Sequence, residues 1–247
     1  MPLVRSGRAL FGAPSLLGGQ AAKAGLSCAS CHINGRGNPH FLLAGISAAP
    51  GTADITSSFF SAARGNANFD PATIPDLAMP GKIARAPQGR ALEAFIRNLI
   101  VEEFGGSEPS AATLNALGAY VRAVEPCETE KRIARGIEDQ LRAIDDGVIA
   151  AALMAERDDS AGVSVAVAGM RHELGLIAER YAGPDLARER AALLAMSRAL
   201  QEIGNREDPA RALSAWKAEF DRRLSDRLRR SAKRSLYDPD RLARSLR

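Results

Sequence analysis

The chain has few cysteines, few histidines, few aromatic residues and no long apolar run. Its three cysteines, Cys28, Cys31 and Cys127, are too few for a disulfide framework, so we expect the fold to depend on an apolar core. No stretch of about 18 consecutive apolar residues occurs, which excludes a typical transmembrane helix within the sequence. Because 46% of the 247 residues are apolar, the chain can build one large or two smaller globular domains.

The net charge of +4 is small for this length, but basic residues gather near the C-terminus. Acidic residues, among them Glu219, Asp221 and Asp226, are interspersed with them. This mixture indicates the solvated face of a helix and no nucleic-acid partner. Contact with an acidic protein or with an anionic membrane surface is the alternative. The basic residues are Lys217, Arg222, Arg223, Arg227, Arg229, Arg230, Lys233, Arg234, Arg241, Arg244 and Arg247.

A Cys-x-x-Cys-His sequence is present at residues 28–32. Two cysteines three positions apart can each add to one vinyl group of a haem, and the adjoining histidine places an imidazole under the iron. The sequence therefore predicts one covalently attached haem c. Cys28 and Cys31 are the predicted attachment residues, and His32 is the predicted proximal iron ligand.

Two other kinds of site also use a Cys-x-x-Cys pair, namely zinc sites and thioredoxin-like redox dithiols. A zinc site needs further ligands, but no second Cys-x-x-Cys and no His-x-x-x-His follows. No strand–helix–strand pattern precedes the motif, as a thioredoxin-like fold requires. A histidine directly after the second cysteine is needed only for haem. Cys127 is expected to be an ordinary residue at a helix start, with an intermolecular disulfide as the alternative.

The second axial ligand of the iron decides the function of such a haem. A strong second ligand favours electron transfer, whereas an open position admits peroxide, oxygen or small gases. Met79, on a loop between Pro75 and Gly81, is the predicted ligand, because a thioether stabilises ferrous iron. A wall residue that fills a gap in the pocket is the alternative for Met79. His40 and His172 are the rival ligands, followed by three methionines of the second half, Met154, Met170 and Met196.

Arg36 lies four positions after the proximal histidine. A guanidinium at this place is predicted to pair with a haem propionate through charge-assisted hydrogen bonds. The alternative is an exposed surface side chain.

The first half of the chain predicts short helices joined by long irregular loops. A short amphipathic helix is expected within residues 5–17, and a glycine-rich loop follows at 33–40. Residues 41–78 are apolar but broken by proline and glycine, and a large flat apolar ligand gives such loops something to pack against. Apolar residues recur at helical spacing over 90–104 and 111–124, the second helix being capped by Ser110. We place a domain boundary after residue 126.

The second half, 127–247, has the pattern of long charged helices. They are predicted over about 128–156, 163–181, 185–204 and 209–235, with short connections that favour an antiparallel bundle. The predicted fold is therefore all-α: a cytochrome c-like haem domain with long irregular loops, 1–126, followed by a helical bundle. A module for docking or for formation of a homodimer is the role expected for the bundle.

Several stretches of the first half resemble a known family. They are Gly7–Phe11, Ser27–His32, Asp54–Phe60 and the segment from Leu92 to Val121. Together they are similar to the bacterial di-haem cytochrome c peroxidase superfamily, including its methylamine-utilisation relatives. The resemblance implies that Cys28, Cys31 and His32 hold a haem and that a methionine, matched in position by Met79, is the distal ligand. This chain has only one haem motif, so the activity of a two-haem peroxidase does not carry over.

These observations favour a mono-haem c-type cytochrome that passes single electrons between redox partner proteins. A peroxidase-like enzyme is the first alternative, with His40, Asp54 or Glu102 as proton carrier. A haem-based sensor with the helical half as its output is the second. The haem of such proteins is attached outside the bacterial cytoplasmic membrane, so we expect a periplasmic or other extracytoplasmic location. Residues 1–5 do not begin a secretory signal, so we expect a leader to have been removed or the chain to be trimmed.

Overall fold

The structure is a computed structural model that describes residues 1–57, 59–60, 65–79, 81, 90–126, 135–204, 206 and 208–246. The chain is mostly helical, which confirms the all-α class. It divides into two compact units, Met1–Thr129 and Glu130–Arg247, called here the N-terminal and the C-terminal unit. The division falls three residues after the boundary expected at 126. No helix among the described residues is long and apolar enough to cross a membrane.

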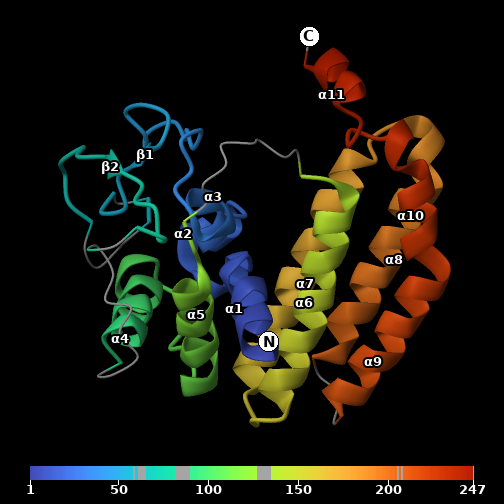
Figure 1. The fold of residues 1–247 in the computed structure, drawn as a ribbon, viewed down its shortest axis with the longest axis horizontal. Coiled ribbons are helices and arrows are strands. Elements are labelled where there is room, and N and C mark those ends of the chain that lie inside the picture. Colours follow the sequence, from blue (N-terminus) through green and yellow to red (C-terminus); the bar gives the residue numbers. More distant parts are fainter. Residues whose placement is uncertain are drawn as a thin grey trace. The chain divides into compact units, whose positions relative to one another are not determined.

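Two helices from opposite ends of the N-terminal unit form its main packing contact (Figure 1). Helix α1 (Pro2–Phe11) begins with a proline, whose missing N–H costs nothing in a first turn. Helix α5 (Ala111–Ala123) is capped by Ser110, whose hydroxyl accepts a hydrogen bond from the Thr113 amide at 3.0 Å. Gly7 lies directly on α5, since a Cβ there would be 2.0 Å from the Ala116 carbonyl oxygen. One turn later the rings of Phe11 and Tyr120 meet edge to face at 5.1 Å.

The α1 helix differs in position from the helix expected within residues 5–17. It starts earlier and ends at Phe11, where Gly12 follows, and Pro14 opens a separate 3-10 turn, η1 (Pro14–Leu16). A proline ring at position 14 would clash with the preceding turn of a continuing helix, so the chain changes direction there. Short helices α2 (Gly19–Lys23) and α3 (Cys28–Cys31) come next, and then the 3-10 turn η2 (Ile33–Gly35).

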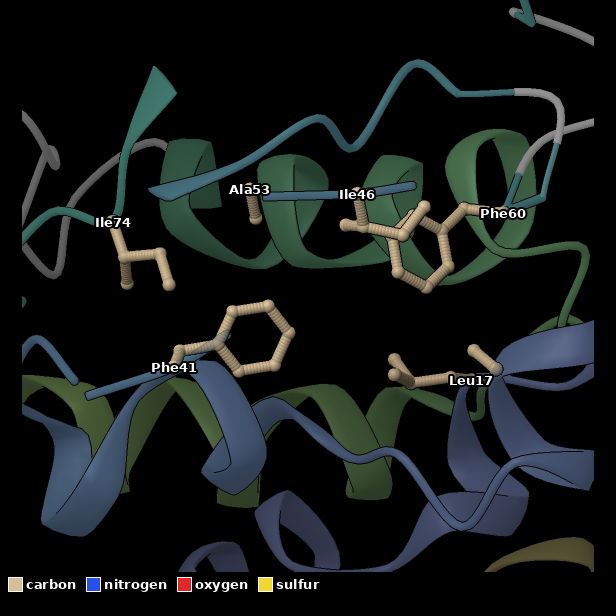
Figure 2. Packing of buried hydrophobic residues seen from close by; sticks show 7 residues of the cluster. Leu17, Phe41, Ile46, Ala53, Phe60 and Ile74 are labelled. Carbon is tan, nitrogen blue, oxygen red and sulfur yellow. The ribbon is translucent and has the colours of Figure 1, made fainter. Parts of the chain in front are cut away.

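The loops expected between 41 and 78 are mostly irregular. They include a short antiparallel pair, β1 (Thr52–Ala53) and β2 (Ala72–Thr73), in which Thr52 is opposite Thr73. Figure 2 shows the apolar cluster that these loops form together with Leu17. Ile46, Ala53, Phe60 and Ile74 lie on one side of it and face Phe41 and Leu17 on the other.

The helix predicted over 90–104 is confirmed, with one change of geometry. Helix α4 (Ala91–Asn98) continues as the wider π-helical turn η4 (Leu99–Glu103). On α4, the buried Glu93 binds Arg122 of α5 through two hydrogen bonds of 2.6 and 2.9 Å. The Glu93 carboxylate lies against Gly118, where any Cβ would come within 2.4 Å of it. A fork-to-fork pair of this kind fixes α4 on α5.

The C-terminal unit contains the long helices expected from the sequence. They are α6 (Ile137–Ala155), α7 (Ser160–Arg180), α8 (Ala187–Ile203) after the 3-10 turn η5 (Pro184–Leu186), and α9 (Pro209–Phe220). Helix α9 runs on through a π-helical turn, η6 (Asp221–Ser225), into α10 (Asp226–Ser231) and η7 (Ala232–Arg234). A last short helix, α11 (Pro239–Ser245), was not expected. The start of the helix predicted from residue 128 lies outside the described residues.

Each long helix of this unit packs on two others. Contacts join α6 with α7, α7 with α8, α8 with α9 and α9 with α6. Helices α6 and α7 approach closely at Gly147 of α6. The side chain of Met170 from α7 packs on this glycine, where a Cβ would lie 2.2 Å from the Met170 Cγ atom. Such pairing is what a four-helix bundle requires, although the antiparallel arrangement stays a prediction. Met154 and Met170, two of the outside candidates for iron ligation, are fully buried in this core.

Candidate haem site

The Cys-x-x-Cys-His motif forms a single helical turn. In α3, Ser27 precedes the turn, and its amide donates to the Ser30 hydroxyl at 3.0 Å, while the His32 amide closes the turn on the Cys28 carbonyl at 2.8 Å. Residues at positions i and i+3 of a helix share one face, so the thiols of Cys28 and Cys31 point the same way. Both pack against the apolar cluster of Figure 2.

An apolar cavity of about 300 Å³ adjoins this turn. Its volume lies at the lower end of the range of small-molecule pockets. Cys28, Cys31 and His32 form part of its wall. The other wall residues are almost all aliphatic or aromatic and come from α1, the 17–27 segment, the 52–77 loops, α4 with η4 and the residue after it, and α5. They are Phe11, Leu17, Leu26, Ser27, Ala53, Ile55, Phe60, Ala72, Thr73, Ile74, Pro75, Leu77, Leu92, Phe95, Ile96, Leu99, Ile100, Phe104, Leu117 and Val121.

Both thiols are protonated at neutral pH. Burial raises the pKa of Cys28 to about 12, with a further contribution from Cys31, and burial raises the pKa of Cys31 to about 11. Redox dithiols and metal-binding thiols act as thiolates, which need a lowered pKa and a polar or cationic surrounding. Cys28 and Cys31 instead have raised pKa values and apolar surroundings. Within the described ranges no group of three or more His, Cys, Asp or Glu side chains is arranged to hold a metal ion.

His32 presents its imidazole beside the two thiols. The ring lies 6.3 Å from that of Phe11, and its Nδ1 atom is buried without a hydrogen-bond partner. Burial lowers the pKa of His32, while the carbonyl groups of Pro75 and Arg36 and the Asp76 carboxylate oppose that shift. A neutral imidazole is the form that binds a metal ion, and the carbonyl groups beside the ring hold its orientation. Two neutral thiols, a neutral imidazole and an apolar cavity lined by all three residues therefore fit a covalently bound haem.

Arg36 has a protein partner in the structure. Its Nε donates to both oxygens of Asp76 at 2.7 Å, Nη2 lies 2.6 Å from Oδ2, and Nη1 donates to the Glu125 carbonyl at 3.4 Å. Arg36 is not among the residues that line the cavity. Its predicted pairing with a haem propionate stays a prediction, but two of its three guanidinium nitrogens already contact Asp76.

Met79 lies on the expected loop but not on the cavity wall. Its side chain is 52% exposed, and it follows Pro75 and Leu77, which do line the cavity. The structure thus brings together Cys28, Cys31 and His32 but not Met79.

The other candidates for ligation or proton transfer also lie off the cavity wall. His40 is exposed, and His172 lies on α7 of the C-terminal unit, where burial lowers its pKa. Asp54 is buried and accepts two hydrogen bonds from Thr56, while Glu102 is exposed and pairs with Arg97 at 3.5 Å. None of these four residues lines the cavity.

The helix over 91–103 has a role that its sequence pattern did not reveal. The sequence predicted an amphipathic helix here, and its apolar stripe, Leu92, Phe95, Ile96, Leu99 and Ile100, forms one wall of the cavity. In the structure Phe95 is 51% exposed and Ile96 and Leu99 are half-buried, whereas Leu92 and Ile100 are buried. Such exposure cannot be predicted from periodicity alone.

Comparison of the chain with protein-family models, with curated proteins and with solved structures gave no match. Its chemistry is therefore inferred from its own residues.

Proposed function

We propose that the chain is a mono-haem c-type cytochrome that carries single electrons between redox partner proteins. The observation that supports this most is the grouping of two neutral thiols and the neutral His32 imidazole at one edge of an apolar cavity of about 300 Å³. Each component has another use in proteins, but together they supply what haem c needs: two attachment points, one axial ligand and an apolar enclosure.

The chain's own residues have three tasks in this proposal. The S–H groups of Cys28 and Cys31 would add across the two vinyl groups of the haem, sulfur to one carbon and hydrogen to the other, which gives two thioether bonds with no by-product. His32 would supply one ligand to the iron. The aliphatic and aromatic walls exclude water, which disfavours the more highly charged ferric state and raises the reduction potential. When bound, the haem supplies a one-electron couple, so no catalytic acid or base is required.

Several further expectations belong to this proposal. The location is extracytoplasmic, because haem c is attached there, and the C-terminal unit serves docking to a partner or formation of a homodimer. The resemblance of the first half to the di-haem cytochrome c peroxidase superfamily agrees with a haem domain of this kind. Met79 is kept as the second iron ligand, which requires the chain after Ala78 to turn inward from the exposed position described above.

Haem stoichiometry tests the proposal directly. The full chain is produced in the bacterial periplasm together with haem-attachment machinery, and covalent haem is measured by mass spectrometry and by the pyridine haemochrome spectrum. One haem per chain is expected, with loss of one or both thioethers in Cys28→Ser and Cys31→Ser. Cys127→Ser is the matched control and keeps its haem. A chain without covalent haem, or equal loss in the control, contradicts the proposal.

A peroxidase-like haem protein is the second candidate, and the position of Met79 favours it. Among the described residues that line the cavity, His32 is the one imidazole, and no methionine, lysine or carboxylate is present. An iron held only by His32 would bind small ligands on its other side. Carbon monoxide added to the ferrous protein separates the candidates: slow or no binding that becomes rapid in Met79→Ala supports the cytochrome, and rapid binding in the wild type supports the open site.

A further inference from the structure

Two segments far apart in sequence meet beside His32. One is 32–38, which follows the haem motif, and the other is 74–78, which carries the cavity-wall residues Ile74, Pro75 and Leu77. Their backbones touch, since a Cβ on Gly37 would lie 3.2 Å from the Ile74 carbonyl oxygen and 3.7 Å from the Asp76 amide nitrogen. This approach leaves little room for a side chain at position 37.

The Arg36–Asp76 ion pair fastens these segments to each other. The guanidinium meets the carboxylate through three contacts of 2.6 to 2.7 Å, and the two side chains are only 28% and 24% exposed. On the other side, Asp76 Oδ1 accepts a hydrogen bond from the Ala78 amide at 2.8 Å, which fixes the turn that carries Leu77. A planar pair with its donors and acceptors matched is more rigid than an ordinary surface ion pair.

His32 lies at the point where this fastening acts. Arg36 is separated from it by the single 3-10 turn η2, and Pro75, which shares the cavity wall with His32, directly precedes Asp76. The backbone carbonyls of Arg36 and Pro75 both act on the imidazole, one from each segment. Movement of either segment would therefore change the surroundings of the ring.

We propose that Asp76, held by Arg36, is a positioning residue for His32: the ion pair keeps the 74–78 segment against the imidazole and thereby fixes the proximal ligand in the haem site. The inference rests on the proposed haem function and deepens it. It gives Arg36 a task different from binding a propionate. Breaking the pair lets the segments separate, admits water beside His32 and loosens the orientation of the ring.

The test compares two carboxylates of the same unit in the haem-loaded protein. Asp76→Asn keeps the size of the side chain and removes its charge. The matched control is Glu108→Gln, because Glu108 forms a similar bidentate pair with Arg97, at 2.8 and 2.6 Å, away from the cavity. Asp76→Asn is expected to shift the midpoint potential and the ferric absorption spectrum, whereas Glu108→Gln leaves both at the wild-type values. The exchanged pair Arg36→Asp/Asp76→Arg is expected to return the potential toward the wild type.

A second measurement needs no haem. In the haem-free full chain with Cys127→Ser, the reaction rate of Cys28 and Cys31 with a disulfide reagent reports opening of the cavity wall. Asp76→Asn is expected to raise this rate at least about threefold over Glu108→Gln, as local opening becomes easier. If the Asp76→Asn protein contains little haem, the midpoint potential is measured on Asp76→Glu instead. That variant keeps the negative charge but displaces it by one methylene group.

The outcomes are separable. A wild-type chain without covalent haem overturns the proposed function and this inference with it. A haem-loaded wild type whose Asp76 variant has the same potential as the Glu108 variant overturns the inference alone, whatever the thiol rates show. A shift that the exchanged pair does not reduce also overturns it, because the charge and not the pairing would then be responsible.

Discussion

Replacing Gly7 by alanine is expected to break the contact that organises the N-terminal unit. The added Cβ would lie 2.0 Å from the Ala116 carbonyl oxygen and 2.7 Å from the Tyr120 Cβ. Ordinary contacts are 3.4 Å or longer, so α1 and α5 must separate by about 1.4 Å. The obstructing atoms are backbone, which cannot rotate away as a flexible side chain can.

The cost follows from this geometry. Overpacking a tight core costs about 1–3 kcal/mol, and a clash with rigid backbone belongs at the upper end. Alanine recovers about 1 kcal/mol through its better helix propensity. The expected net loss is therefore about 2 kcal/mol, which corresponds to a fall of roughly 8 °C in the melting temperature of a unit of this size. Separation of the helices also moves Phe11, which contacts both Tyr120 and His32.

Urea and thermal unfolding of the full chain, followed by far-UV circular dichroism, measure the loss. The only tryptophan, Trp216, lies in the C-terminal unit, so its fluorescence reports whether the effect is confined to the other unit. Gly12→Ala is the control, because a Cβ there would meet its nearest atoms at 3.6 and 3.7 Å. If Gly7→Ala and Gly12→Ala unfold at the same midpoint, the close approach of α1 and α5 is not as described.

Three further variants test other contacts. Glu93→Gln should cost about 3 kcal/mol near neutral pH, because it removes the buried carboxylate charge that pairs with Arg122. The hydrogen bond with Arg122 lowers the pKa of Glu93 below its ordinary 4.5. This stabilisation therefore exists above that pH and is lost as the pH falls through the lowered pKa. Urea unfolding at pH 7 and in acid should therefore show a gap between wild type and variant that closes in acid. Tyr181→Phe should cost about 1–2 kcal/mol by the same assay, since the phenol donates to the buried Leu228 carbonyl at 2.6 Å. Gly175→Ala, with open space around its Cβ, should stabilise α7 by about 0.5–1 kcal/mol.

Each of these variants has an outcome that contradicts its reason. A pH-independent gap for Glu93→Gln means that its charge does not contribute. Unchanged stability of Tyr181→Phe means that the Ser231 hydroxyl, which also donates to the Leu228 carbonyl at 3.3 Å, is a sufficient partner for it. Destabilisation by Gly175→Ala means that the position contacts something not seen in its surroundings.

The helices and the attachment turn could be predicted from the sequence because their signals are local. The stripe from Leu92 to Ile100 has helical spacing, and Ser110 precedes α5 as a cap. The grouping of Cys28, Cys31 and His32 needs only one turn of helix. These features depend on neighbours within about four positions, so no tertiary information is required.

The remaining parts of the site depend on contacts between distant positions. Arg36 and Asp76 are 40 residues apart, and nothing in the intervening loops indicates that they meet. The exposed position of Met79 depends likewise on how the 74–78 turn packs, which composition does not specify. The sequence indicated that the Arg36 guanidinium needs a charged partner, but only the folded structure identifies Asp76 as that partner.

The walls of the apolar cavity are drawn from positions between Phe11 and Val121, which is nearly the whole N-terminal unit. An occupant that touches all of these walls acts as a shared core for segments that lie far apart in the sequence. Closing such long loops is slow and costs chain entropy before any contact repays it. If the proposed haem is that occupant, the unit must gain it before its packing is complete. A chain that collapses too tightly before haem attachment would then exclude the haem.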